Sequence, residues 1–273
     1  VPLTLMRLVS TAIHPIINII VPMCLLTIGY SSTESLELIG IIFGMCMPII
    51  TIPSTIIGSI NMVILPDISA STHNIPLLHN KIKTNYKLIM ICSFIMLPIF
   101  IVLSEPICVT LYSNINAGYY LCYTAWLIIP MSIHQYFSSI MNALGKEKQN
   151  FIFSTIASII MLIFILITTQ YLNIFALPLG LGINSILASI LCVTYIKKTT
   201  HYNHNVLSDI VLNAALCMIT LLLDYFIYNI VAMIFPTIFC LIAISGISII
   251  SYLILIITFQ YIDIGFIHGI VKG

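Results

Sequence analysis

Long apolar runs without an ionisable side chain recur along almost the whole chain. The run from Phe151 to Thr169, for example, contains only apolar and hydroxyl side chains. Because a helix rises about 1.5 Å per residue, about 20 such residues cross a hydrocarbon core roughly 30 Å thick. With 60% hydrophobic and 6% charged residues, the chain also lacks the polar side chains that cover a soluble domain. The runs therefore predict transmembrane helices.

The breaks between the runs divide the chain into eight predicted spans. These are residues 3–28, 39–65, 88–111, 117–144, 151–169, 177–196, 209–228 and 234–259. In lipid, helices satisfy every backbone hydrogen bond within one segment. The predicted fold class is therefore an all-α polytopic membrane protein with about eight transmembrane helices.

An eight-span chain places all nine lysine and arginine residues on one side of the membrane, with Arg7 near the start of the first span and the others outside the spans. They are Arg7, Lys81, Lys83, Lys87, Lys146, Lys148, Lys197, Lys198 and Lys272. The opposite side contains Glu34, Glu37 and, near the end of the third span, Glu105, and it contains no lysine or arginine. The positive-inside rule then predicts a multi-pass protein of the plasma membrane with both termini in the cytoplasm.

The first span carries polar side chains at intervals of three and four residues, which places them on one helix face. They are Thr4, Arg7, Ser10, Thr11, His14 and Asn18. Ionisable groups are costly beside lipid, so this face is expected to point to the bundle interior or to water. In the alternative interpretation, Arg7 lies at the cytoplasmic interface and the hydroxyl groups bond to their own helix.

Weaker polar faces follow on the second and fourth spans. They comprise Gly44, Pro48, Thr51, Ser54, Thr55, Gly58 and Asn61 on the second, and Gln135, Ser138, Ser139 and Asn142 on the fourth. Such residues are also typical of helix-packing seams. Paired prolines in spans one and two, Pro15 with Pro22 and Pro48 with Pro53, predict bent helices beside a cavity. Together the three faces predict a cavity wall.

Residues that would support chemistry are sparse. No span carries two acids at catalytic spacing, the eight cysteines stand singly, and no phosphate-binding glycine loop occurs. Glu105 and Asp224 lie near the outer ends of their spans and are predicted to be interfacial. The expectation is a protein that is not an enzyme, with no catalytic residue, cofactor or metal. The net charge of +1 favours no nucleic-acid partner.

Several segments together resemble a known family. They are PLTLMRLV, GMCMPIITIPSTIIGSINMVILPDIS, SEPICVTLYSNINAGYYL, IIPMSIHQYFSSIMNALGKEKQ and ALPLGLGINSILASILCVTYIKK. In this order they are similar to the stage V sporulation protein B branch of polysaccharide and lipid-linked oligosaccharide transporters. That branch belongs to the superfamily that also holds the lipid II flippases and the multidrug and toxin extrusion proteins.

The resemblance implies how the chain is divided. Family members usually have fourteen spans, arranged as two six-helix lobes followed by two extra helices. Residues 1–200 would then form the second lobe and residues 201–273 the terminal pair, with an N-terminal lobe supplied in cis or in trans. The resemblance also implies a substrate cavity, which Gln135 on the polar face of span four would join. The predicted cavity residues are Arg7, His14, Asn18, Thr51, Ser54, Asn61 and Gln135.

The implied function is part of a flippase that moves a lipid-linked precursor of the cell wall, such as peptidoglycan, or of a polysaccharide, in sporulation or growth. Expected partners are membrane lipids and a lipid-linked oligosaccharide or polyprenyl-pyrophosphate, for which Arg7 is the only cation in the cavity set. Two alternatives stay open. One is a cation-coupled multidrug exporter, and the other is a non-transporting or truncated membrane subunit.

Overall fold

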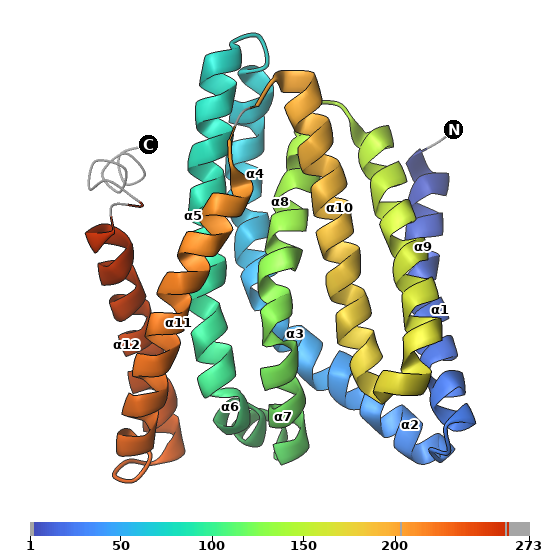
Figure 1. The fold of residues 1–273 in the computed structure, drawn as a ribbon, viewed down its shortest axis with the longest axis vertical. Coiled ribbons are helices and arrows are strands. Elements are labelled where there is room, and N and C mark those ends of the chain that lie inside the picture. The colour runs from blue at the N-terminus through green and yellow to red at the C-terminus, as the bar shows by residue number, and fades with distance from the viewer. Residues whose placement is uncertain (1–2, 203, 260, 262–273) are drawn as a thin grey trace. The chain divides into compact units, whose positions relative to one another are not determined.

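A computed structural model describes residues 3–202, 204–259 and 261, with side chains described from Pro15 onwards. The described residues form helices joined by short turns and include no strand (Figure 1). The helices are α1 (Leu3–Thr27), α2 (Ser32–Ile39), η1 (Gly40–Cys46), α3 (Met47–Ile50), α4 (Ile52–Ala70), α5 (Ile75–Val102), α6 (Ser104–Tyr112), α7 (Ile115–Thr124), η2 (Ala125–Leu127), α8 (Ile128–Ala143), α9 (Glu147–Leu172), η3 (Asn173–Phe175), α10 (Ala176–Thr200), α11 (Val206–Val231) and α12 (Thr237–Thr258).

Six helical segments among the described residues are long and apolar enough to cross a membrane. They are Ser32–Ile50, Ile52–Ala70, Ile75–Val102, Glu147–Thr200, Val206–Val231 and Thr237–Thr258. The segment Glu147–Thr200 contains two helices, α9 and α10, which fold back on each other through η3. Shorter apolar helices accompany these segments. The predicted all-α polytopic membrane fold is confirmed.

The predicted second span is longer than expected and is not one straight helix. It begins at α2, where Ser31 and Glu34 form a capping box, and then continues through a π-helix, η1, into the short α3. Thr51 separates α3 from α4. Pro48 and Pro53 stand on either side of this break and provide no amide hydrogen for helical bonds. The break expected from the paired prolines is therefore present here.

The chain forms two compact units. Unit 1 comprises Val1–Met90 with Trp126–His204, and unit 2 comprises Ile91–Ala125 with Asn205–Gly273. Residues 91–125 thus cluster with the two C-terminal helices. The division into transport lobes at residues 200 and 201 stays a prediction.

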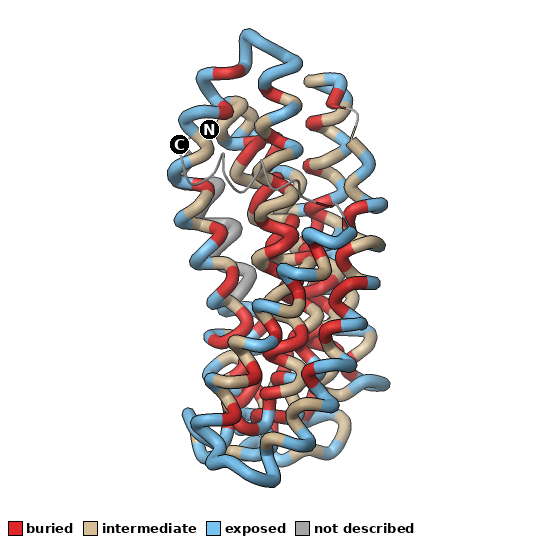
Figure 2. Tube along the Cα trace, turned by 90° about the vertical axis from the view of Figure 1, so that its left-hand side faces the viewer, coloured by how far each residue is buried: buried red, intermediate tan, exposed pale blue. Residues whose placement is uncertain are grey.

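In unit 1, helix α8 packs between α4 and α10, α10 packs on α9, and α9 packs on α1 (Figure 1). Buried residues follow the helices, while the turns at their ends are mostly exposed (Figure 2). Two glycines of α10 allow close approach, because Gly180 lies against Ile165 of α9 and Gly182 lies against the ring of Trp126. Small residues serve this purpose in membrane helix bundles.

The basic turns of unit 1 lie at one end of its helices. His79, near the start of α5, has its Nε2 2.7 Å from the carbonyl oxygen of Thr200 at the end of α10. At the same end, Asn150 in the first turns of α9 donates to Asn142 near the end of α8. The turns that carry Lys81, Lys146, Lys148, Lys197 and Lys198 therefore share this end, as the one-sided pattern requires. That this end faces the cytoplasm stays a prediction.

In unit 2, α6 and α7 form a hairpin, α11 and α12 pack side by side, and α12 also contacts α6. The hairpin is tight because the α-carbon of Gly118 lies against the backbone of Glu105. Large apolar side chains on the outer faces of α11 and α12 are exposed, among them Leu222, Phe226 and Ile242. An exposed apolar surface of this kind suits contact with lipid.

Candidate functional site

The least buried side of α8 is its polar side. Gln135 and Ser138 are half-buried and Asn142 is exposed, and their spacing of three and four residues places them on one face. The opposite side carries Tyr136 and Ile140, which are fully buried. A helix exposed only to lipid would show the reverse pattern, with its polar residues turned inward. The open side of α8 is therefore suited to water or to a polar ligand.

Helix α4 has the same asymmetry. One side carries Thr51, Ser54, Thr55, Gly58 and Ser59, all half-buried or exposed. An adjoining exposed side carries the apolar residues Ile52, Ile56 and Val63. The polar side ends at Met62, an exposed apolar residue four positions after Gly58. The apolar side is suited to lipid and the polar side to water.

Two hydrogen bonds join the polar sides of these helices. The side-chain amide of Gln135 donates to the backbone carbonyl oxygen of Ser54 at 2.9 Å, and that of Asn61 donates to Oγ of Ser139 at 3.2 Å. Gly58 lies beside the Gln135 amide, since a β-carbon there would stand 3.5 Å from Gln135 Nε2, which is an ordinary van der Waals contact. We call this surface the α4–α8 polar face. It consists of Thr51, Ser54, Thr55, Gly58, Ser59, Asn61, Gln135, Ser138, Ser139 and Asn142.

The hydroxyl groups on α4 donate mainly to their own helix. Oγ1 of Thr51 bonds to the carbonyl oxygens of Met47 and Pro48, and Oγ1 of Thr55 bonds to that of Ile52. The same kind of bond was the alternative expected for the hydroxyl groups of the first span. Each hydroxyl oxygen still has acceptor capacity, because a hydroxyl has two lone pairs. The face therefore offers uncharged hydrogen-bond acceptors, which are suited to hydroxyl donors on a ligand.

Sequence reasoning missed Asn150, which links three helices next to the α4–α8 polar face. Its Nδ2 donates to Oγ of Ser138 at 2.8 Å and to Oδ1 of Asn142 at 2.9 Å, and its Oδ1 lies 3.6 Å from Sγ of Cys192. Asn150 thereby connects α8, α9 and α10. A signal was present in the sequence, since this amide stands directly after the charged turn at the start of an apolar run.

Of the seven predicted cavity residues, the structure brings four to this region: Thr51, Ser54, Asn61 and Gln135. Asn18 is exposed on α1, and α1 packs on α9 and α2. No hydrogen bond joins Asn18 to α4 or α8 in the part of the chain that the structure describes. The backbone of Arg7 and His14 lies in α1, but their side chains are outside the described residues.

Asp224 has a completely buried side chain in the described structure. Its predicted position near the membrane interface stays a prediction. Helix α11 continues to Val231, so Asp224 lies seven residues before its end. Glu105, by contrast, is exposed near the start of α6. No group of three or more His, Cys, Asp or Glu side chains among the described residues is arranged to hold a metal ion.

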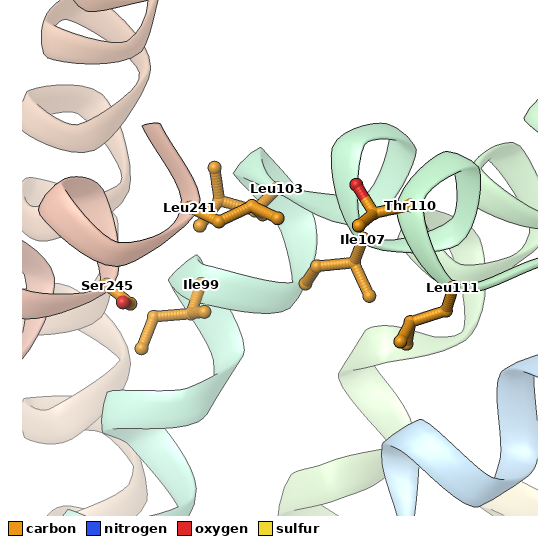
Figure 3. Close-up of a pocket in the computed structure, with 7 residues that line it drawn as sticks. All are labelled: Ile99, Leu103, Ile107, Thr110, Leu111, Leu241 and Ser245. Atoms are coloured by element: carbon orange, nitrogen blue, oxygen red, sulfur yellow. The ribbon is translucent and has the colours of Figure 1, made fainter. Parts of the chain in front are cut away.

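Unit 2 contains a hollow of a different kind. A groove of about 260 Å³ lies between α5, α6 and α12 (Figure 3). Its lining is Ile99, Leu103, Ile107, Thr110, Leu111, Leu241 and Ser245. The lining is almost entirely apolar, so this groove is suited to hydrocarbon, unlike the α4–α8 polar face.

The fold of this chain was compared with those of known proteins. No protein-family model and no curated protein matches it. Among solved structures it is similar to one described as lipid II flippase MurJ in an inward closed conformation, with a TM-score of 0.67 and 18% sequence identity. The match covers 87% of this chain and 49% of the other. The chain thus spans about half the length of that flippase. At this identity the likeness shows the fold.

Proposed function

We propose that this chain is part of a membrane flippase that moves a lipid-linked cell-wall or polysaccharide precursor by alternating access. One observation carries the proposal. The α4–α8 polar face presents amide and hydroxyl groups on the open side of α8, whose opposite side is buried, and on α4, which also exposes apolar residues on an adjoining side. A polar surface at this depth needs water or a polar ligand.

The chemistry of the face fits a sugar headgroup better than a cation. A sugar offers many hydroxyl donors and acceptors, and the face offers uncharged acceptors together with the Gln135 amide. A polyprenyl tail needs no such path, because it can stay in the hydrocarbon. The break at Thr51, between prolines, gives α4 a point at which it can change direction, as broken helices do in other transporters.

The remaining predicted residues complete this proposal. Arg7, His14 and Asn18 on α1 would form the second wall, with Arg7 binding the pyrophosphate through a charge-assisted hydrogen bond. An N-terminal lobe, in cis or in trans, is included because the similar flippase chain is about twice as long. The basic end of unit 1 would lie in the cytoplasm, with the protein in the plasma membrane.

The direct test is translocation in vesicles. The protein, with any lobe that co-purifies with it, is reconstituted with a fluorescent lipid-linked oligosaccharide placed in the inner leaflet. We expect the sugar to become accessible to an added glycosidase that cannot cross the bilayer. The Arg7→Ala variant should slow this exposure on the order of tenfold, equivalent to about 1.4 kcal/mol.

Two other results would argue against a flippase. Exposure at the rate of protein-free vesicles would contradict the proposal. Sodium- or proton-dependent efflux of a cationic dye, without sugar exposure, would instead favour the multidrug exporter. A glycerophospholipid with a small headgroup is the control substrate, because it would reveal non-specific scrambling.

A further inference from the structure

The seam between α11 and α12 contains polar side chains in an otherwise apolar helix pair. Asn213, Thr220 and Asp224 of α11 and Ser248 and Tyr252 of α12 are all fully buried. Their spacing of four and seven residues puts them on the facing sides of the two helices. Polar groups buried at membrane depth are expensive and are commonly functional.

Most of these groups are paired. Tyr252 donates from its hydroxyl to Oδ1 of Asn213 at 2.8 Å, and Asn213 donates to the backbone carbonyl oxygen of Asp209 at 2.7 Å. Thr220 donates to the carbonyl oxygen of Cys217 at 2.8 Å. These bonds give hydrogen-bond partners to the side chains of Asn213, Thr220 and Tyr252.

Asp224 and Ser248 are the exception. Both carboxylate oxygens of Asp224 and Oγ of Ser248 are buried without a hydrogen-bond partner among the described residues. Ser248 is nevertheless the polar group close enough to interact with the carboxylate. The register of the two helices agrees with this placement. Sγ of Cys240 on α12 lies 3.7 Å from the carbonyl oxygen of Val231 on α11, eight residues before Ser248 on one helix and seven after Asp224 on the other. The pair therefore faces each other across the seam.

The surroundings contain no positive charge. The described part of unit 2, residues 91–125, 205–259 and 261, has no lysine, arginine or histidine. Besides Asp224, the titratable residues of α6 and of the stretches 217–231 of α11 and 237–252 of α12 are Cys217, Tyr225 and Tyr228 on α11, Cys240 and Tyr252 on α12, and Glu105, Cys108 and Tyr112 on α6. None of them is a cation in any protonation state. An ionised Asp224 would thus be a buried charge without a counterion, which is strongly unfavourable.

We propose that Asp224 is a proton-binding site in the α11–α12 seam. One proton from water binds to a carboxylate oxygen, and the resulting neutral acid donates a hydrogen bond to Oγ of Ser248. The acid form satisfies both side chains with one bond, since a protonated carboxyl has one O–H donor and Ser oxygen is an acceptor. Release returns the proton to water. This inference does not depend on the proposed transport function.

A proton fits this site better than a metal ion. Hard cations bind several oxygen ligands at once. Here the unpartnered oxygens are the two of Asp224 and the one of Ser248. Asp224 lies seven positions before the end of α11 at Val231, so a proton has to cross about 10 Å between Asp224 and that end. Losing the proton would favour separation of the two helices or entry of water between them.

Infrared spectroscopy of the protein in nanodiscs tests the proposal. We expect a carbonyl stretching band of a protonated carboxylic acid at neutral pH, which disappears reversibly at alkaline pH. The band should shift when the aspartates are labelled with carbon-13 at the side-chain carboxyl, and it should be missing from Asp224→Asn. The Asp67→Asn variant is the matched control, because Asp67 is exposed and its loss should leave the band unchanged.

Three outcomes would overturn the proposal. One is the absence of a protonated-acid band at neutral pH, and another is a band that persists in Asp224→Asn. The third is an alkaline midpoint that moves when sodium replaces choline, which would indicate a metal cation. If Asp224→Asn does not fold, Ser248→Ala keeps the test decisive. Removing the acceptor should move the frequency of the isotope-sensitive band, and an unmoved band would contradict the pairing.

Discussion

Replacing Gln135 with Leu should abolish most transport while leaving the protein folded. Leu has a similar volume but cannot donate to the carbonyl oxygen of Ser54, and it puts an apolar group at the centre of the α4–α8 polar face. A single cross-helix hydrogen bond in a membrane protein is worth only about 0.6 kcal/mol on average, so the bundle should survive. Sugar exposure in the vesicle assay should fall at least roughly tenfold, or about 1.4 kcal/mol.

A matched control shows whether the effect comes from losing Gln135 in particular or from losing any polar side chain. Thr168 of α9 is half-buried, and its hydroxyl bonds to the carbonyl oxygen of Phe164 in its own helix, away from the face. Thr168→Val should therefore transport at the normal rate. Equal transport by Gln135→Leu and Thr168→Val would show that the face is not on the substrate path.

Replacing Gly182 with Val should strongly destabilise unit 1. A β-carbon at this position would overlap the indole ring of Trp126, and valine adds two methyl groups beyond it. Overpacking of this kind usually costs about 1–3 kcal/mol, and sometimes more. We expect a clearly lower melting temperature in detergent. Trp126 is the single tryptophan, so its fluorescence will report the displaced ring directly.

Two further variants identify the cause of the lower stability of Gly182→Val. Adding Trp126→Leu to Gly182→Val removes the overlapping ring and should recover much of the stability. Gly246→Val is the matched control, because a β-carbon at Gly246 of α12 would meet no atom within 4 Å. If Gly246→Val is as unstable as Gly182→Val, the clash with Trp126 is not the reason.

The sequence predicted the helices well because their signal is local. The length of the apolar runs predicted membrane-spanning helices. The spacing of the polar residues from 135 to 142 predicted which side of α8 is the less buried one. The prolines predicted the break near Thr51. Its detailed form, with a π-helix at Gly40–Cys46 before it, depends on packing and was not visible in the pattern.

The unpredicted parts depend on contacts between distant residues. Asn150 is a single amide in sequence, and its role appears only when α8, α9 and α10 meet. Asp224 was expected at the interface because it lies near the end of an apolar run. Its burial follows from the longer α11 and from the side of that helix that packs on α12. Spacing along one helix cannot identify the neighbour that a side chain faces.

Water exposure of the α4–α8 polar face is the central claim, and thiol labelling of neighbouring residues tests it most directly. Thr55 and Ile56 are both exposed at nearly the same depth, but Thr55 is on the polar side of α4 and Ile56 on the apolar side. The background carries Ala at Cys24, Cys92 and Cys122, because the other five cysteines are buried. A charged maleimide should label Thr55→Cys at least roughly tenfold faster than Ile56→Cys, as expected for a thiol that water can reach and ionise. Equal, slow labelling of both variants would contradict the account.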